Sequence, residues 1–284
     1  MNISESEIIT GERFQSLAEI SICVDIPYHN QASLSRINHC NINDSHIIAR
    51  IGNAKVIFVY PDVFSRFFND VYPHIPQNFV MISHNSDFPV DEKYRYILDA
   101  PNCKIIKWYA LNALFIHPKI IGIPIGVGNA HLPFGNLNIL YDKIIKPINK
   151  TKLCYFYFTI ETNRDIRNRV RDIVQNRLNI PFGHIESHED YLNHLSQCKY
   201  CICPIGNGAD SFRFWECHYL GVIPIVEFSP VLVHFNVPYL LVSDWNNISI
   251  ELLENNYQSI LSSKSALHAS KLSTYKNMIA NNFV

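Results

Sequence analysis

The chain has no long hydrophobic run, although 48% of its 284 residues are hydrophobic. No apolar stretch approaches the roughly 20 residues that a membrane-spanning helix requires. The first residues, MNISESEIITGERF, have neither a basic start nor an apolar segment of the secretory type. We therefore expect a cytoplasmic protein with a sizeable core. Peripheral association with the inner face of a membrane is left open.

An excess of charge of either sign is also lacking. The formal net charge is −1, and charged residues make up 17% of the chain. Proteins that bind nucleic acid without sequence preference need a basic surface to meet the phosphates. The composition therefore predicts no nucleic-acid partner.

Metal-binding spacings are scarce among the eight cysteines and thirteen histidines. Cys198, Cys201 and Cys203 form a cluster with Cys217 downstream, but a second Cys-x-x-Cys pair and an HExxH motif are absent. Cys201 and Cys203 fall on one face of a predicted strand. Cytoplasmic thiols stay reduced, and cysteine is among the most often buried residue types. The pattern predicts buried free thiols, no bound metal and no resident cofactor.

Apolar strand-like runs alternate with helical segments, and runs such as VIFVY and FVMI are typical of buried parallel strands. In the first half we predict strands at residues 20–26, 55–60, 78–83, 104–107 and 120–125, and helices at 62–71, 91–100 and 109–115. In the second half we predict strands at 153–158, near 185, and at 200–203, 222–227 and 239–242, and helices at 163–177, 189–197, 211–220, 249–261 and 264–281.

A stretch with four lysines and one proline, residues 137–152, interrupts this alternation and is the best linker candidate. A chain of 284 residues is long enough for two compact α/β units. We therefore predict two domains, residues 1–150 and 151–284.

The most informative segment is KYCICPIGNGADSFRFWECHYLGVIPIV, residues 199–226. It predicts a strand, a turn containing Gly206 and Gly208, a short helix and a second strand. Open α/β sheets bind ligands where such strands end, and the first turn of a helix there attracts anions. Asp210 is a candidate helix N-cap. The segment suits a phosphorylated, hydroxyl-bearing ligand.

Two charged residues on the predicted helix carry this interpretation. Arg213 lies in the first turn, where a guanidinium can join the backbone N–H groups around a diphosphate. Glu216 lies one turn deeper and could accept hydrogen bonds from ribose hydroxyls. The alternative is a solvated i,i+3 ion pair worth roughly 0.2–0.5 kcal/mol.

The run GNGADSFRFWECHYLGVIPIV resembles the donor-site signature of exostosin-like glycosyltransferases. The stretch TIETNRDIRNRV resembles the strand-to-helix junction that opens their nucleotide-binding domain and that of the related fucosyltransferase-like group. FVMISHNSD and KWYALNALFIHPKIIGIPIGVGN resemble acceptor-side segments of bacterial and viral members. The likeness covers about residues 55–242. The membrane anchor, luminal disulfides and extra C-terminal transferase domain of animal exostosins are not visible in this sequence.

The resemblance implies the GT-B fold, an α/β architecture of two Rossmann-like domains facing a central cleft. It implies a donor site at residues Gly206, Asn207, Gly208, Asp210, Ser211, Arg213 and Glu216. Arg167 lies nearest the position where these families place a diphosphate-binding Arg or Lys, and Arg164 is the second choice. In such enzymes protein groups, rather than a metal, stabilise the leaving diphosphate.

On the acceptor side, His84, Asn85 and Asp87 follow a predicted strand directly. An inverting transferase needs a general base for the acceptor hydroxyl. Asp87 and His84 are the candidates, with Glu161 as a weaker third. His84 could equally be a hydrogen-bonded structural residue, and Asp87 an ordinary turn residue.

The motif IPIGVGN supplies a second predicted cleft segment. Gly126, Gly128 and Asn129 would let the backbone approach a sugar, although a plain turn explains the glycines almost as well. Together these features predict an inverting, metal-independent glycosyltransferase of surface polysaccharide synthesis. Its partners would be a nucleotide sugar, with uridine favoured over guanosine, and a glycan acceptor. A Rossmann-type phosphoryl or pyruvyl transferase and a catalytically silent carbohydrate- or nucleotide-binding relative are the alternatives.

Overall fold

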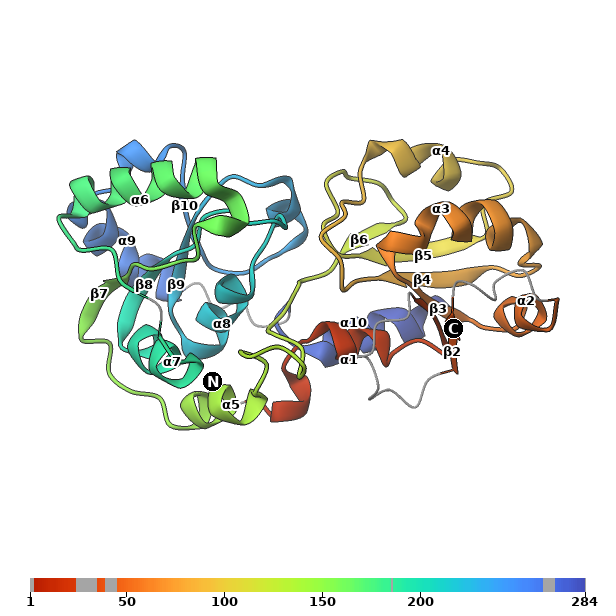
Figure 1. Cartoon of the computed structure of the whole chain (residues 1–284), viewed down its shortest axis with the longest axis horizontal. Coiled ribbons are helices and arrows are strands. Elements are labelled where there is room, and N and C mark those ends of the chain that lie inside the picture. The colour runs from red at the N-terminus through yellow and green to blue at the C-terminus, as the bar shows by residue number, and fades with distance from the viewer. Residues whose placement is uncertain (1–2, 24–34, 39–44, 185, 263–268, 284) are drawn as a thin grey trace. The chain divides into compact units, whose positions relative to one another are not determined.

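The computed structural model describes residues 3–23, 35–38, 45–184, 186–262 and 269–283. Within these ranges the chain is an α/β protein with two parallel β-sheets, and it divides into two compact units (Figure 1). We call residues 9–125 and 272–284 the six-stranded unit, and residues 1–8 and 126–271 the four-stranded unit. None of the helices in the described ranges is both long and apolar enough to cross a membrane.

The six-stranded unit has the strand order β2-β1-β3-β4-β5-β6, and every pair is parallel. Its strands are β1 (Ile20–Cys23), β2 (Ser35–Asn38), β3 (Val56–Val59), β4 (Phe79–Ser83), β5 (Ile105–Ala110) and β6 (Ile120–Gly122). Its helices are α1 (Gly11–Gln15), α2 (Ser45–Gly52), α3 (Phe64–Arg66), α4 (Arg95–Leu98) and α10 (Leu272–Ala280). The helix predicted at residues 109–115 is wrong, because β5 runs on to Ala110 and Asn112 then turns with a φ of 51°.

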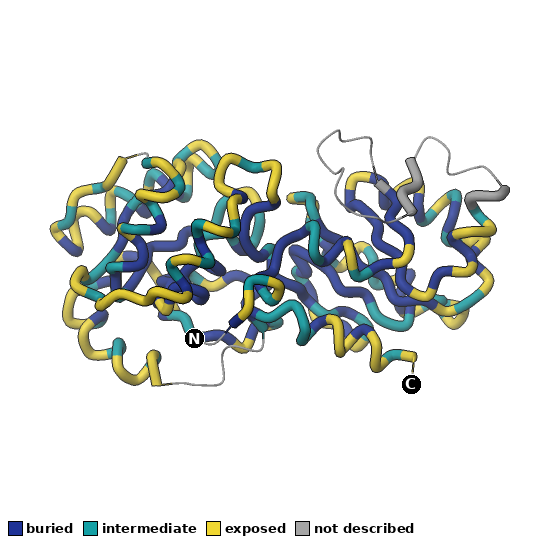
Figure 2. Tube along the Cα trace, turned by 90° about the horizontal axis from the view of Figure 1, so that it is seen from below, coloured by how far each residue is buried: buried dark blue, intermediate teal, exposed yellow. Residues whose placement is uncertain are grey.

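Strands β3 and β4 lie at the centre of this sheet, and their burial agrees with that position. Every residue of both strands is buried, as expected for parallel strands covered on two faces (Figure 2). The C-terminal helix α10 also belongs to this core, since Tyr275 and Ile279 are buried in the same cluster as β3 and β4.

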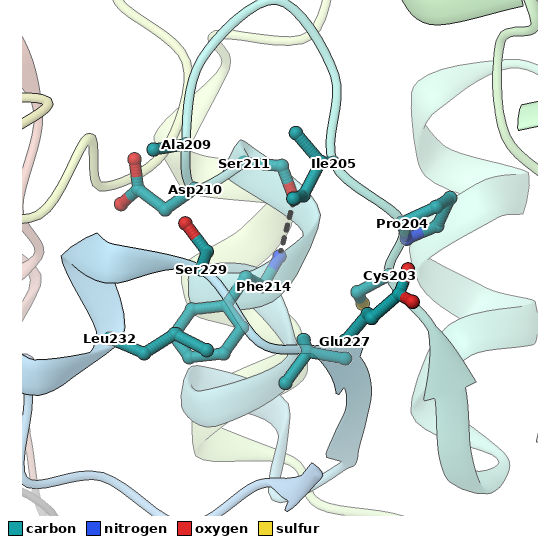
Figure 3. A pocket seen from close by; sticks show the side chains of 11 residues that line it. Cys203, Pro204, Ile205, Ala209, Asp210, Ser211, Phe214, Glu227, Ser229 and Leu232 are labelled. Carbon is teal, nitrogen blue, oxygen red and sulfur yellow. Dashed lines mark hydrogen bonds between the residues drawn. The ribbon is translucent and has the colours of Figure 1, made fainter. Parts of the chain in front are cut away.

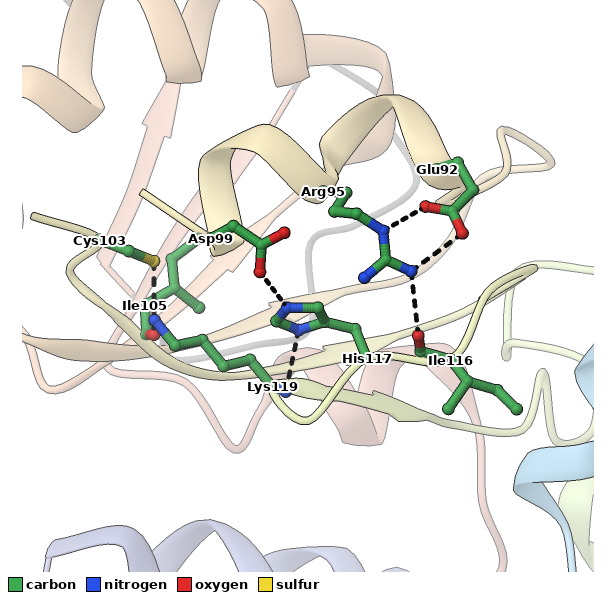
Figure 4. A network of polar contacts seen from close by, with 8 residues as sticks. All are labelled: Glu92, Arg95, Asp99, Cys103, Ile105, Ile116, His117 and Lys119. Atoms are coloured by element: carbon green, nitrogen blue, oxygen red, sulfur yellow. Dashed lines mark hydrogen bonds and ion pairs between the residues drawn. The ribbon is translucent and has the colours of Figure 1, made fainter. Parts of the chain in front are cut away.

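A polar network fixes α4 to the segment that leads into β6 (Figure 4). Arg95 donates to both carboxylate oxygens of Glu92, at 2.6 and 2.9 Å, and to the Ile116 carbonyl at 3.3 Å. His117 Nε2 lies 3.0 Å from Asp99 Oδ1.

The four-stranded unit has the parallel order β10-β9-β8-β7. Its strands are β7 (Lys152–Tyr155), β8 (Cys198–Ile202), β9 (Ile223–Glu227) and β10 (Leu240–Val242). Its helices are α5 (Leu137–Ile145), α6 (Arg164–Leu178), α7 (His188–Ser196), α8 (Phe212–Leu220) and α9 (Ile250–Ser262). The strand predicted near residue 185 lies partly outside the described residues.

Helices cover both faces of this second sheet. Figure 1 shows α6 and α9 on one side of it, and α7 and α8 on the other. Strand β8 serves both layers because its side chains alternate. Tyr200 and Ile202 are buried with α6 and α9, which leaves Cys201 for the opposite face.

The division into units differs from the predicted boundary near residue 150. Residues 126–150 belong to the four-stranded unit, and residues 272–284 to the six-stranded unit. Residues 137–145, predicted as linker, form α5, which buries Leu140 and Ile144 and packs on α7 and α8. The spacing of these two residues is that of one helical face, and it outweighs the nearby lysines.

Candidate functional site

The candidate site lies where β7 and β8 end and α8 begins, at the carboxyl edge of the four-stranded sheet. Ser211 caps α8, because its side chain accepts a hydrogen bond from the backbone N–H of Phe214 at 3.3 Å (Figure 3). The prediction that Asp210 is the cap is therefore wrong. Asp210 Oδ2 instead accepts a hydrogen bond from the buried indole of Trp215 at 2.6 Å. A buried indole N–H needs such a partner.

Arg167 holds the glycine-containing loop before α8. Its guanidinium donates to three backbone carbonyl oxygens. Nε bonds to that of Ile205 at 3.0 Å, Nη1 to that of Thr159 at 2.6 Å and Nη2 to that of Pro204 at 3.3 Å. A Cβ added to Gly206 would lie 2.7 Å from Nη2, so a larger residue here would displace the guanidinium. Arg167 is 5% exposed, and its predicted contact with a diphosphate stays a prediction.

Burial lowers the pKa of Arg167 to about 10, and the positive charge of Arg213 adds to this effect. Arg167 is still a cation at neutral pH. The two guanidinium groups repel one another, which favours an anion beside them. Arg164, the second choice for a phosphate ligand, is an exposed residue at the start of α6. Asn207 is exposed, and Gly208 is half-buried in the same loop as Gly206.

Arg213 lines a pocket with a volume of about 210 Å³. The pocket is lined by Pro133, Phe134, Tyr155, Tyr157, Thr159, Glu186, His188, Tyr191 and Arg213. The guanidinium carbon of Arg213 lies 5.6 Å from the centre of the Tyr191 ring, and its buried Nε has no hydrogen-bond partner. Burial opposes the charge of Arg213, but the nearby Tyr191, Cys201, Cys203 and Glu216 raise its pKa above the usual value. The pocket thus contains a permanent cation with an unused N–H donor.

Glu216 is only 3% exposed and does not lie on a solvated helix face. Its Oε2 accepts a hydrogen bond from the Tyr191 hydroxyl at 2.5 Å, and its Oε1 lies 3.7 Å from His188 Nε2. Burial is the main cause that raises the pKa of Tyr191 well above its usual value, and the charge of Glu216 is the second. The phenol therefore stays protonated and can donate this hydrogen bond. The alternative of a solvated Arg213–Glu216 ion pair is wrong. The predicted contact between Glu216 and a ribose stays a prediction.

Glu186 and His188 add unsatisfied polar atoms to the same pocket. Glu186 Oε1 lies 2.7 Å from His194 Nδ1, whereas its buried Oε2 has no hydrogen-bond partner. Both ring nitrogens of His188 are likewise buried without one. Because buried polar groups are nearly always satisfied, these atoms need partners from outside the protein, either water or a bound molecule.

The sequence predicted a helix at residues 189–197 but did not predict that two residues of α7 line the pocket. His188 and Tyr191 stand three positions apart on one face of this helix, and that spacing was the available signal. Leu192 and Leu195, which are fully buried, give a stronger apolar signal that concealed it.

The predicted cleft segment around Gly126 belongs to the four-stranded unit. Gly126 has a φ of 72°, which favours glycine, and Asn129 is buried with its carbonyl accepting from Leu132 N–H at 2.9 Å. The same loop brings Phe134 to a ring distance of 5.4 Å from Phe212 on α8. This loop is therefore a neighbour of α8.

Three of the acceptor-side candidates, His84, Asn85 and Asp87, lie in the six-stranded unit. His84 is 2% exposed; its Nδ1 accepts from the Asn85 backbone N–H at 2.7 Å, and its Nε2 lies 3.0 Å from the Pro124 carbonyl. Burial lowers the pKa of His84 to about 4, against the raising effect of the Pro124 and Asn85 hydrogen bonds. His84 is therefore a neutral residue with both ring nitrogens engaged, a poor arrangement for a general base.

Asp87 is exposed three residues beyond His84, and its carboxylate is the more accessible candidate. Asn85, between them, has a φ of 65° and donates from Nδ2 to the Tyr60 hydroxyl at 3.4 Å. Glu161 is exposed in the turn that precedes α6 and belongs to the four-stranded unit. The structure thus places His84, Asn85 and Asp87 together, and Glu161 in the other unit.

A comparison of the chain with protein-family models finds no match. The chemistry of the site must therefore be argued from its own residues.

Proposed function

We propose that the chain is a glycosyltransferase that uses a nucleoside diphosphate sugar. The observation that carries this proposal is the pocket at the carboxyl edge of the four-stranded sheet. It combines the Arg213 cation, whose buried Nε–H is unused, with the aromatic side chains of Phe134, Tyr155, Tyr157 and Tyr191. A cation at a helix N-terminus suits a diphosphate, and aromatic walls suit a nucleoside.

The unsatisfied atoms favour uridine over guanosine in the donor. Uracil has one ring N–H between two carbonyl oxygens, whereas guanine presents adjacent N–H donors that need two acceptors. Glu186 has one unpartnered oxygen, and His188, which lines the same pocket, can donate from a ring nitrogen. One acceptor and one donor in the pocket suit the uracil edge. The donor would then span the pocket from Glu186 to Arg213.

In the proposed reaction the two units form a GT-B enzyme, with the glycan acceptor on the side of Asp87. The Asp87 carboxylate takes the proton of the acceptor hydroxyl as its oxygen attacks the anomeric carbon. The bond from that carbon to the diphosphate breaks, and the sugar is transferred with inversion. Arg213 and the free N–H groups of α8 stabilise the charge on the departing diphosphate without a metal.

A thermal-shift panel of UDP, GDP, CDP, ADP, phosphoenolpyruvate and inorganic phosphate tests this proposal. A ligand at 100 times its dissociation constant stabilises the folded state by about 2.7 kcal/mol. We expect the largest shift with UDP, and slow hydrolysis of a UDP-sugar without acceptor. No shift with any nucleoside diphosphate would contradict the proposal. A shift with phosphoenolpyruvate alone would favour a pyruvyl transferase, and UDP binding without any turnover of UDP-sugars would favour a silent relative.

A further inference from the structure

Three cysteines converge in the core between β8 and α8. Cys201 and Cys203 leave the sheet on the same face, two residues apart, and Cys217 meets them from the helix. Their three Sγ atoms all lie within 4.8 Å of one another. Cys201 and Cys217 are fully buried and Cys203 is 5% exposed. The sequence predicted ordinary buried thiols because spacing alone did not bring Cys217 to the other two.

The surroundings of the three sulfurs can support negative charge. The thiols hydrogen bond to one another, and Arg213 lies close enough to interact with Cys203. A metal site needs thiolates, and the positive charge of Arg213 next to the cluster favours negative charge on the sulfurs.

We propose that Cys201, Cys203 and Cys217 form a binding site for one soft, thiophilic metal ion of the Cu(I) type. Thiolate ligands select soft ions. Structural zinc requires four protein ligands, and among the described residues no fourth His, Cys, Asp or Glu joins this group. Cu(I) is satisfied by three thiolates. Binding releases the thiol protons to solvent, and the copper keeps its oxidation state.

Little movement is needed for the sulfurs to reach an ion. Metal–sulfur bonds of about 2.3 Å bring three sulfurs to about 4 Å from one another, so the longest separation must shrink by less than about 1 Å. Cys203 also lines a small pocket of about 20 Å³ with Pro204, Ser211 and Glu227 (Figure 3). An ion bound here would connect α8 to β8 through Cys217 and Cys201, close to Arg213.

The test is a titration of the full-length, reduced protein with Cu(I) under anaerobic conditions, against a competing chelator. We expect one ion per chain, an ultraviolet thiolate-to-metal charge-transfer band, a higher melting temperature, and an X-ray absorption spectrum in which copper has three sulfur neighbours. Zn(II) in the same titration should bind more weakly. Wild-type protein that binds no Cu(I), or binds it with fewer than three sulfur neighbours, would overturn the proposal.

Serine variants locate the site. Cys203→Ser and Cys217→Ser should lower Cu(I) affinity by more than the roughly 10- to 100-fold that loss of an outer partner costs. Cys198→Ser is the matched control, since Cys198 is 1% exposed but lies outside the cluster. Circular dichroism confirms that each variant is folded. If a variant is not folded, the number of sulfur neighbours of copper in the wild type tests the site. Equal affinity in the control and a folded cluster variant would contradict the assignment.

Discussion

The Tyr191 hydroxyl donates a hydrogen bond to the Glu216 carboxylate across 2.5 Å, and this contact joins α7 to α8 beneath the pocket. The ring of the same tyrosine lies 5.6 Å from the Arg213 guanidinium carbon. Tyr191 therefore contacts both the cation and the anion of α8, and among the described residues no direct ion pair joins these two. Arg213 remains able to meet a ligand, while Glu216 is used to hold the wall of the site.

The hydrogen bond between Tyr191 and Glu216 should contribute to stability. Tyr191→Phe removes the donor and leaves a carboxylate that is 3% exposed without that partner. We expect the free energy of unfolding to fall by about 1–3 kcal/mol, measured by urea denaturation at neutral pH. Tyr96→Phe is the control, because Tyr96 is 74% exposed. Equal stability of the two variants would show that the contact is not formed.

His84 and His218 should make the fold sensitive to mild acid. Burial is the main cause that lowers the pKa of His84 to about 4 and of His218 to about 3, from an unfolded value of 6.5. The unfolded chain therefore takes up protons first, so stability is complete above pH 6.5 and declines as the pH falls towards 4. For His84 the decline amounts to about 3 kcal/mol.

Urea unfolding at pH 7, 5.5 and 4 measures this decline. His84→Gln keeps a donor and an acceptor but cannot titrate, so the variant should lose less stability than the wild type between pH 7 and 4. His74→Gln, at an exposed position, should behave like the wild type. A wild-type free energy that does not change over this range would contradict the buried, neutral state of both histidines.

The strands were predictable where one residue pattern determines them. VIFVY and FVMI are uninterrupted apolar runs, and they form the fully buried β3 and β4. The helix predicted at residues 211–220 likewise forms α8, and its end at Gly221 has the left-handed conformation that glycine favours. Local chemistry was sufficient for these elements.

The partners of buried polar groups could not be predicted in the same way. Glu216 bonds to a residue 25 positions away, and Arg167 bonds to a loop 37 and 38 positions away. These hydrogen-bond partners depend on which elements pack together. The sequence therefore identified the charged residues but not the groups to which they bond. The return of α10 to the six-stranded unit is a tertiary contact of the same kind.

Asp87 should matter for turnover and not for donor binding. Asp87→Asn keeps the shape of the side chain but removes its ability to accept a proton, so the rate of sugar transfer should fall by roughly 10²–10⁴. Its melting temperature and UDP affinity should stay unchanged, since Asp87 is exposed. Asp62→Asn, also exposed in the six-stranded unit, is the control. A fully active Asp87→Asn enzyme would point to another base or to a retaining mechanism.

Turnover should not require a hard divalent cation. Arg213 and the N-terminus of α8 offer the positive charge that Mg²⁺ or Mn²⁺ provides in other transferases. Rates of UDP-sugar turnover measured with added Mg²⁺, with added Mn²⁺ and with EDTA should agree within about twofold, well short of the roughly 10²-fold that loss of an electrostatic catalytic group costs. Strict dependence on either ion would contradict the proposed role of Arg213.

The most direct test of the account is the affinity of UDP for Arg213→Gln, measured by isothermal titration calorimetry. Loss of a charge-assisted hydrogen bond costs roughly 1.5–3 kcal/mol, so affinity should fall about 10- to 100-fold. Arg164→Gln is the matched control, because Arg164 is exposed and does not line the pocket. We predict weak UDP binding to Arg213→Gln and wild-type binding to Arg164→Gln. Unchanged UDP affinity in a folded Arg213→Gln variant would contradict the proposal that this pocket holds the donor.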